Sequence, residues 1–140
     1  MATALVEVHA VVYPPLESSA WNVQPGNNFP AKDSPYYPRG TSIPLRDGTP
    51  GWGLVHIEQG HGHGPSGNEF TPEDRQATAD ALLNPDTGYP KRQSDGSVVF
   101  KRGDRLVIVR VQTVDRNGQP IAPDGGMQGI ITSYPPSEGV

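Results

Sequence analysis

Glycine and proline interrupt this chain so often that regular structure can form in only a few short stretches. The 140 residues include 17 Gly and 16 Pro, and half of the prolines fall within the first 50 residues. Proline cannot donate a backbone hydrogen bond, and glycine loses more backbone freedom on folding than other residues do. We therefore expect one loop-rich domain with a modest core, because this length is typical of a single domain.

The first 50 residues contain one regular apolar stretch. The segment from Ala4 to Tyr13 is rich in valine and predicts a strand that ends at Pro14-Pro15. From Leu16 to Pro50 the composition favours an extended, irregular segment. Aromatic residues are rare in free linkers, so those of this segment indicate that it wraps over the core. They are Trp21, Phe29, Tyr36 and Tyr37.

The middle of the chain combines an apolar segment, a loop and a helix. Residues 51–57 are apolar, and the Gly- and His-rich residues 58–68 predict a loop. Thr71 then suits the N-cap of a helix, and Pro72 suits its first position. Pro85 should end this helix at the preceding residue.

Three β segments follow the helix, at residues 97–102, 105–114 and 128–134. Gly103-Asp104 is compatible with a tight hairpin, and turn residues also precede the last segment. Such short links predict an antiparallel meander, since parallel strands need a long crossover. The expected fold class is α+β: one main helix packed on a three- to four-stranded antiparallel sheet, with a Pro-rich irregular N-terminal segment.

Side-chain alternation predicts which faces of the strands are buried. In the central strand, an apolar face should receive the helix, and it consists of Val107, Val109 and Val111. Arg110 should project from the opposite face. In the last strand, Thr132 and Tyr134 should share one face, while Ile131 and Ser133 share the other.

Composition excludes several classes of protein. The formal charge of −4 and the pI near 5.4 give no global positive field that would attract nucleic acid. The absence of cysteine excludes disulfides, thiolate zinc sites and cysteine nucleophiles. No apolar run approaches the ~20 residues of a membrane span, and the N-terminus lacks a signal-peptide pattern. We therefore expect neither a transmembrane protein nor an ordinary secretory precursor.

The basic residues cluster in the second half of the chain. Seven of the 11 Lys and Arg residues fall between residues 91 and 116. Such clustering is a first indication of a phosphate-binding face, although a solvated strand surface gives the same pattern.

Three of the four histidines, His56, His61 and His63, lie within eight positions, with Glu58 between them. Imidazole and carboxylate groups suit zinc, nickel or copper, but flexible His and Gly loops often bind metals adventitiously, so we expect no functional metal. His56 could instead be a general acid or base, since imidazole titrates near pH 6.5. A half-buried histidine bonded to a backbone carbonyl is the structural alternative for His56.

The order of segments between residues 51 and 136 resembles the small ribonuclease toxins grouped as barnase-EndoU-colicin-RelE-like (BECR). The matching segments are GWGLVHI, FTPEDRQATADALLNP, VVFKRGDRLVIVRVQTV and GIITSYP. Phage-associated and polymorphic-toxin members of that group have a GxGxxHI segment, a helix and an antiparallel sheet that ends in an ITxYP-like strand. The resemblance implies a ribonuclease domain at residues 51–140. The Pro-rich N-terminal strand and wrapping segment, residues 1–50, has no counterpart in that group.

The resemblance also implies an activity and its residues. The activity is metal-independent endoribonuclease cleavage without a cofactor, in which a ribose 2'-OH of RNA, with tRNA as one candidate, attacks the adjacent phosphate. His56 would be the general base or acid, and Lys101 or Arg110 would stabilise the charge on the pentavalent phosphate. Thr132 would bond a phosphate oxygen, and Tyr134 would stack on a base or relay a proton. Three further residues would bind substrate: His61, Arg102 and Arg105.

One part of the sequence departs from the BECR pattern. Relatives often continue the His segment as a helix with a second histidine about one turn on. Here Gly60 to Gly64 should interrupt that helix, which leaves the role of His61 open.

The resemblance implies a role in bacterial competition. The chain would be the C-terminal toxin module of a larger effector, secreted or delivered into a target cell cytoplasm. Its implied partners are RNA and a cognate immunity protein, and no membrane is expected as a partner. Two alternatives remain: a non-catalytic adaptor or binding module with a His-rich metal-binding loop, and a toxin acting on a nucleotide cofactor, because Arg and Thr on a sheet also suit a pyrophosphate.

Overall fold

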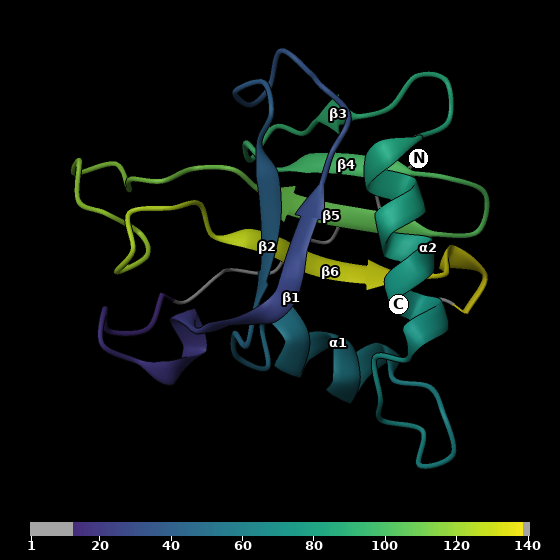
Figure 1. Ribbon diagram of the computed structural model, residues 1–140. Helices are drawn as coiled ribbons and strands as arrows, with labels where there is room; N and C mark the ends of the chain where they lie inside the picture. Colours follow the sequence, from purple (N-terminus) through teal and green to yellow (C-terminus); the bar gives the residue numbers. More distant parts are fainter. Residues whose placement is uncertain (1–12, 139–140) are drawn as a thin grey trace.

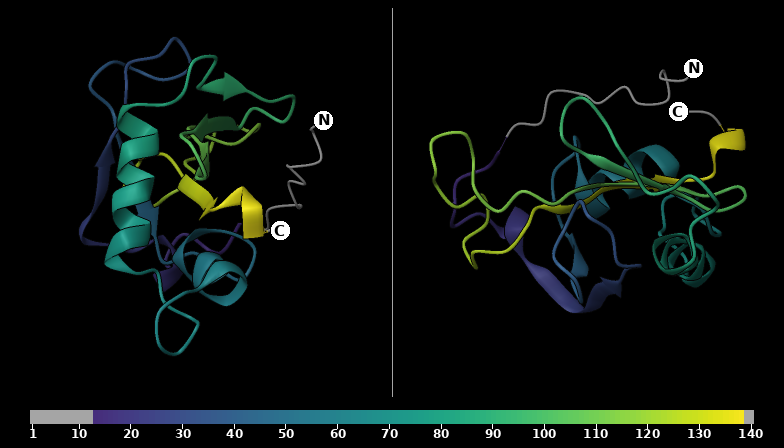
Figure 2. Two further views of the ribbon diagram at one scale, coloured as in Figure 1. Left: turned by 90° about the vertical axis from the view of Figure 1, so that its right-hand side faces the viewer. Right: turned by 90° about the horizontal axis from the view of Figure 1, so that it is seen from above.

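The computed structural model describes residues 13–138 (Figures 1 and 2). The strand expected at Ala4–Tyr13 therefore lies outside the described residues, apart from its last residue. The elements in chain order are η2 (Ser19–Trp21), β1 (Val23–Pro30), β2 (Ser42–Arg46), α1 (Gly53–His61), α2 (Pro72–Leu83), β3 (Lys91–Arg92), β4 (Val98–Lys101), β5 (Leu106–Arg110), β6 (Gly129–Tyr134) and η3 (Pro136–Glu138). These elements confirm the α+β class. No helix within 13–138 is long and apolar enough to cross a membrane.

The second half of the chain forms a four-stranded antiparallel sheet in the order β3-β4-β5-β6. This order confirms the expected meander. The hairpin at Gly103-Asp104 is also confirmed, because Arg102 and Arg105 exchange backbone hydrogen bonds of 3.0 and 3.1 Å across it. Two details differ from the sequence expectation: β3 adds a short edge strand, and β5 ends at Arg110, where the chain leaves the ladder.

Helix α2 begins and ends as expected. The Thr71 hydroxyl accepts a hydrogen bond from the Asp74 backbone N–H at 3.1 Å, and the Asp74 carboxylate accepts one from the Thr71 N–H at 3.1 Å. This reciprocal capping box satisfies two donors that a helix start leaves free. Ala81 and Leu82 pack in one cluster with Val107, which confirms the expected helix-facing side of β5.

Within the segment from Leu16 to Pro50, which was expected to be irregular, β1 and β2 instead pair as an antiparallel hairpin with Phe29 opposite Ile43. The buried Phe29, Ile43 and Leu45 stabilise the hairpin by joining the main core. The expectation that aromatic residues cover the core is confirmed. Trp21, Phe29 and Tyr37 are buried, and Tyr36 packs against the cluster.

The hairpin and α2 lie on the same face of the four-stranded sheet, with β2 crossing in front of it in Figure 1. Gly129, at the start of β6, has φ +91°, and a Cβ there would overlap the carbonyl oxygen of Pro44 in β2. Only glycine allows this close approach. The core cluster therefore combines side chains from before and after residue 50.

Helix α1 extends through the stretch where a loop was expected from residue 58. Gly60 lies inside α1, where a glycine destabilises the helix by about 1 kcal/mol relative to alanine. Burial of a side chain such as Ile57, which is only 1% exposed, contributes about 2–3 kcal/mol. Packing of the helix thus outweighs the propensity of one glycine, and the loop begins at Gly62.

A β-bulge in β6 changes one expected face. Val109 pairs with Ile130 and Ile108 pairs with Thr132, so Ile131 is an extra residue in the ladder. Ile131 joins the second apolar cluster, on the sheet face away from α2, whereas the Ser133 hydroxyl lies 2.6 Å from Thr78 of α2. The expectation that Ile131 and Ser133 share a face is therefore wrong.

Candidate active site

Two histidines of α1 converge on the last strand of the sheet. The His61 ring stacks on the Tyr134 ring, with centroids 4.5 Å apart and planes inclined by 12°. The His56 ring meets the His61 ring edge-on, at 5.6 Å and 78°. Because α1 runs beside β6 (Figure 1), residues about 80 positions apart in sequence form one row of rings.

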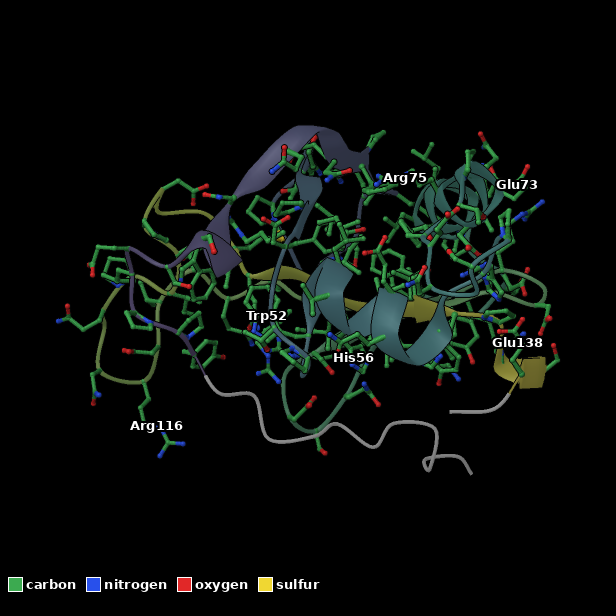
Figure 3. The ribbon with its side chains drawn as sticks, turned by 90° about the horizontal axis from the view of Figure 1, so that it is seen from below. Trp52, His56, Glu73, Arg75, Arg116 and Glu138 are labelled. Carbon is green, nitrogen blue, oxygen red and sulfur yellow. The ribbon has the colours of Figure 1, made fainter. Side chains whose placement is uncertain are left out.

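His56 has a defined neutral tautomer. Its Nδ1 lies 2.9 Å from the carbonyl oxygen of Pro50, and a carbonyl can only accept. Nδ1 therefore carries the proton, and the lone pair of neutral His56 is on Nε2. Figure 3 places His56 on the side of α1 away from the β1-β2 hairpin. The carbonyl bond expected as a structural alternative is thus also the contact that orients a catalytic base.

The surroundings of His61 favour its neutral form. Burial is the main cause that lowers the pKa of His61, and the neighbouring His56 lowers it further. Arg105 and His63 act in the same direction, while Glu138 opposes them. These five side chains therefore share one electrostatic neighbourhood.

Arg105 is a buried cation at the edge of this cluster. Its Nη2 donates to Asp74 Oδ1 at 2.8 Å, and its Nη1 donates to the Ser133 hydroxyl at 3.3 Å. Its Nε is buried and has no hydrogen-bond partner among the described residues. Arg105 thus keeps a donor and a positive charge beside His61.

Asp74 accepts hydrogen bonds from three directions. Thr71, His63 and Arg105 all donate to its carboxylate. Burial alone would raise the pKa of Asp74, but these donors outweigh burial and hold the pKa below its usual value. Asp74 is therefore an anion that fixes the Arg105 guanidinium and the His63 imidazole.

His63 lies between two carboxylates. Its Nδ1 is 2.8 Å from Asp74, and its Nε2 is 2.7 Å from Glu138. These two hydrogen bonds raise the pKa of His63. The sequence interpretation treated His63 only as a potential metal ligand. Its pairing with Asp74 depends on how the loop folds back on α2, and the sequence offers no local signal for it.

The loop that carries His63 is closed by backbone hydrogen bonds. The His63 N–H donates to the Glu69 carbonyl at 2.8 Å, and the Glu69 N–H donates back at 3.0 Å. A Cβ on Gly62 would overlap the backbone of Asn68, so glycine permits this closure. His61 and His63 therefore contact different partners. Residues 13–138 contain no group of three His, Asp or Glu residues arranged to hold a metal ion.

The other expected site residues lie at varied distances from this cluster. Lys101 is opposite Leu106, which is opposite Tyr134, so Lys101 lies two strands from Tyr134, about 10 Å at the usual strand spacing. Its Nζ is 3.7 Å from Asp86. Arg102 donates to the Asn84 carbonyl at 2.9 Å, at the end of α2. Neither side chain contacts the histidine cluster.

Arg110 is at the far end of β5 from the cluster, where it pairs with Asp95 at 3.5 Å. Thr132 is buried in β6, and its hydroxyl has no hydrogen-bond partner within the described part of the chain. The structure thus brings together His56, His61, Tyr134 and Arg105, adds His63 and Asp74, and leaves Arg110 apart.

Comparison with known proteins found no match to a family model, to a curated protein or to a solved structure. The geometry of these residues therefore has to support any functional conclusion by itself.

Proposed function

We propose that this protein is a metal-independent endoribonuclease toxin, which cleaves RNA by attack of a ribose 2'-oxygen on the adjacent phosphate. The observation that carries the proposal is the row of rings in which His56 meets His61 and His61 stacks on Tyr134, with Arg105 in the same electrostatic neighbourhood. The arrangement combines proton-transfer groups, a cation and an aromatic ring, which are the components that this reaction needs.

His56 is the general base in this proposal. Its Nε2 takes the proton of the 2'-hydroxyl, and the Pro50 carbonyl stabilises the imidazolium through Nδ1–H. The 2'-oxygen then bonds to phosphorus as the bond from phosphorus to the 5'-oxygen breaks. The leaving 5'-oxygen takes up a proton, and the products are a 2',3'-cyclic phosphate and a 5'-hydroxyl end.

Arg105 stabilises the charge of the pentavalent phosphate in this proposal, in place of the more distant Arg110. A preorganised cation in a partly dry site acts more strongly on developing charge than a solvated one. Lys101 shares the sheet face of Tyr134 and is assigned to the flanking phosphates of a bound RNA. The Thr132 hydroxyl, which has no hydrogen-bond partner within residues 13–138, is assigned to a phosphate oxygen.

The RNA-cleavage assay tests this function directly. Purified protein is incubated with total RNA and with tRNA in EDTA, and the ends are examined for 2',3'-cyclic phosphate. We expect cleavage by the native protein and a loss of about 10²–10⁴-fold in His56→Ala. Arg39→Gln is a control, since Arg39 is exposed and pairs only with Asp33 among the described residues. Absence of cleavage by the native protein, or full activity of His56→Ala, contradicts the proposal.

An immunity protein is the proposed partner of such a toxin. Because the chain is acidic overall, with a formal charge of −4, that partner is expected to recognise the histidine cluster locally and not through long-range attraction. Co-purification with the product of an adjacent gene, and loss of RNA cleavage in that complex, would support it.

A further inference from the structure

The two carboxylates that bind His63 differ in how firmly they are held. Asp74 is only 5% exposed, and Thr71 and Arg105 fix its carboxylate. The Glu138 side chain is 46% exposed and extends from η3 at the edge of the molecule (Figure 3). A bound molecule can therefore replace Glu138 at Nε2, whereas Asp74 keeps Nδ1 in place.

We propose that His63 is a second proton-transfer residue, which protonates the leaving 5'-oxygen of RNA, with Asp74 as its positioning residue and Glu138 as a replaceable cover of its Nε2. This inference rests on the proposed function, since it assigns the acid in the same reaction. It adds a residue that the BECR resemblance does not supply.

The charged surroundings of His63 favour a proton donor. Its hydrogen-bond partners are Asp74 of α2 and Glu138 of η3, His61 of α1 interacts with it electrostatically, and Arg105, before β5, pairs with the same Asp74. Both ring nitrogens point at carboxylate oxygens, so both carry protons. The hydrogen bonds to Asp74 and Glu138 raise the pKa of His63, whereas burial lowers that of His61.

The position of His63 also suits this role. The His56 and His61 rings are 5.6 Å apart, and His56 and His63 both lower the pKa of His61, so the proposed base and the proposed acid both lie near His61. The paired backbone of His63 and Glu69 fixes the imidazole beside α2. Phosphate can take the place of the Glu138 carboxylate without changing the sign of the charge at Nε2.

The reaction balances with these two residues. His56 removes the 2'-hydroxyl proton, the 2'-oxygen forms its bond to phosphorus, and the bond to the 5'-oxygen breaks. The Nε2–H of His63 moves to that 5'-oxygen, so one proton is accepted and one is donated. Asp74 stabilises the imidazolium before transfer and keeps the neutral ring oriented afterwards.

Comparison of two leaving groups tests the acid role. A 5'-alkoxide needs protonation, but 4-nitrophenolate does not. On RNA, His63→Gln should lose about 10²–10⁴-fold in kcat/KM. On uridine 3'-(4-nitrophenyl phosphate) the same variant should lose less than about tenfold, whereas His56→Ala loses activity on both substrates because the base is needed for each. Equal losses of His63→Gln on both substrates, or no loss on RNA, overturn the proposal for His63.

A native protein that cleaves neither substrate overturns the proposed function itself, and the inference with it. An active native protein with an unaffected His63→Gln overturns only the inference. The melting temperature of each variant is measured in parallel, so that a folding defect is recognised.

Glu138→Gln provides a second test without altering His63, and it decides the question if His63→Gln does not fold. Loss of one carboxylate lowers the pKa of His63, so the alkaline limb of kcat/KM for RNA should move to lower pH. The KM for RNA should fall, because the cover is easier to replace. Glu17→Gln is the matched control at an exposed carboxylate. If Glu138→Gln changes neither the alkaline limb of kcat/KM nor the KM for RNA, the inference is overturned.

Discussion

Arg105 and Asp74 form a buried ion pair, with Nη2 2.8 Å from Oδ1, that joins the beginning of β5 to the first turn of α2. Both side chains are less than a tenth exposed. Two charges in such a position are stable only while each has its partner. The pair therefore links the stability of the helix–sheet contact to the electrostatics of the candidate site.

Asp74→Asn is expected to destabilise the protein by about 3–5 kcal/mol, because it leaves the Arg105 charge buried without an anion. It also weakens the capping box at Thr71. Denaturant unfolding measures the change. Glu73→Gln, at the exposed neighbour in the same helical turn, should change the free energy of unfolding by less than about 0.5 kcal/mol. Similar effects of the two variants would mean that the buried pair contributes little.

The contribution of His63 to stability should depend on pH. The pKa of His63 is raised in the folded protein, so its contribution is fully present below the unfolded value near 6.5 and is lost as pH rises through the folded pKa. The difference in melting temperature between the native protein and His63→Gln should therefore be largest below pH 6 and shrink under alkaline conditions. Thermal unfolding across this range measures it. A difference that grows with pH would contradict the assigned hydrogen bonds to Asp74 and Glu138.

The sequence predicted those parts of the fold that local signals determine. Thr71 and Pro72 marked the start of α2, and Gly103-Asp104 marked the hairpin between β4 and β5. The β1-β2 hairpin was not predicted, because its stability comes from burying Ile43 and Leu45 against distant residues and its prolines suggest irregular chain. The high glycine content around α1 likewise argues against a helix, but tertiary packing stabilises α1.

The candidate site could be predicted only in part for the same reason. His56, His61 and Tyr134 stood out by residue type and segment order, and the structure brings them together. Arg110 stood out as a charge in an apolar strand, but its carboxylate partner is Asp95, at the other end of the sheet from the histidines. His63 and Asp74 meet through a loop closure that no periodicity in the sequence encodes.

The stack of His61 on Tyr134 predicts a difference between two variants. Tyr134→Phe keeps an aromatic ring over His61, whereas Tyr134→Ala exposes the imidazole. Because burial is the main cause that lowers the pKa of His61, this pKa should rise toward 6.5 in Tyr134→Ala and stay low in Tyr134→Phe. An NMR titration of the His61 ring protons measures both. A low pKa in both variants would show that the neighbouring cations, and not the covering ring, control His61.

Gly60 and Gly62 are only two positions apart, but we expect alanine to have opposite effects on stability at these two positions. Gly60 lies within α1, and a Cβ there meets no other atom within 4 Å. Gly60→Ala should therefore stabilise the protein by about 0.5–1 kcal/mol, through higher helix propensity and a less flexible unfolded chain.

Gly62 is the C-cap, and a Cβ there would overlap the Asn68 backbone and the Glu58 carbonyl. Gly62→Ala should therefore destabilise the protein by about 1–3 kcal/mol and displace His63, since the loop closure depends on this contact. Denaturant unfolding of the two variants, with RNA cleavage as a second readout, compares them under one set of conditions. Destabilisation by Gly60→Ala would mean that α1 ends before residue 60, and His61 would then lose the helical support that positions it on Tyr134.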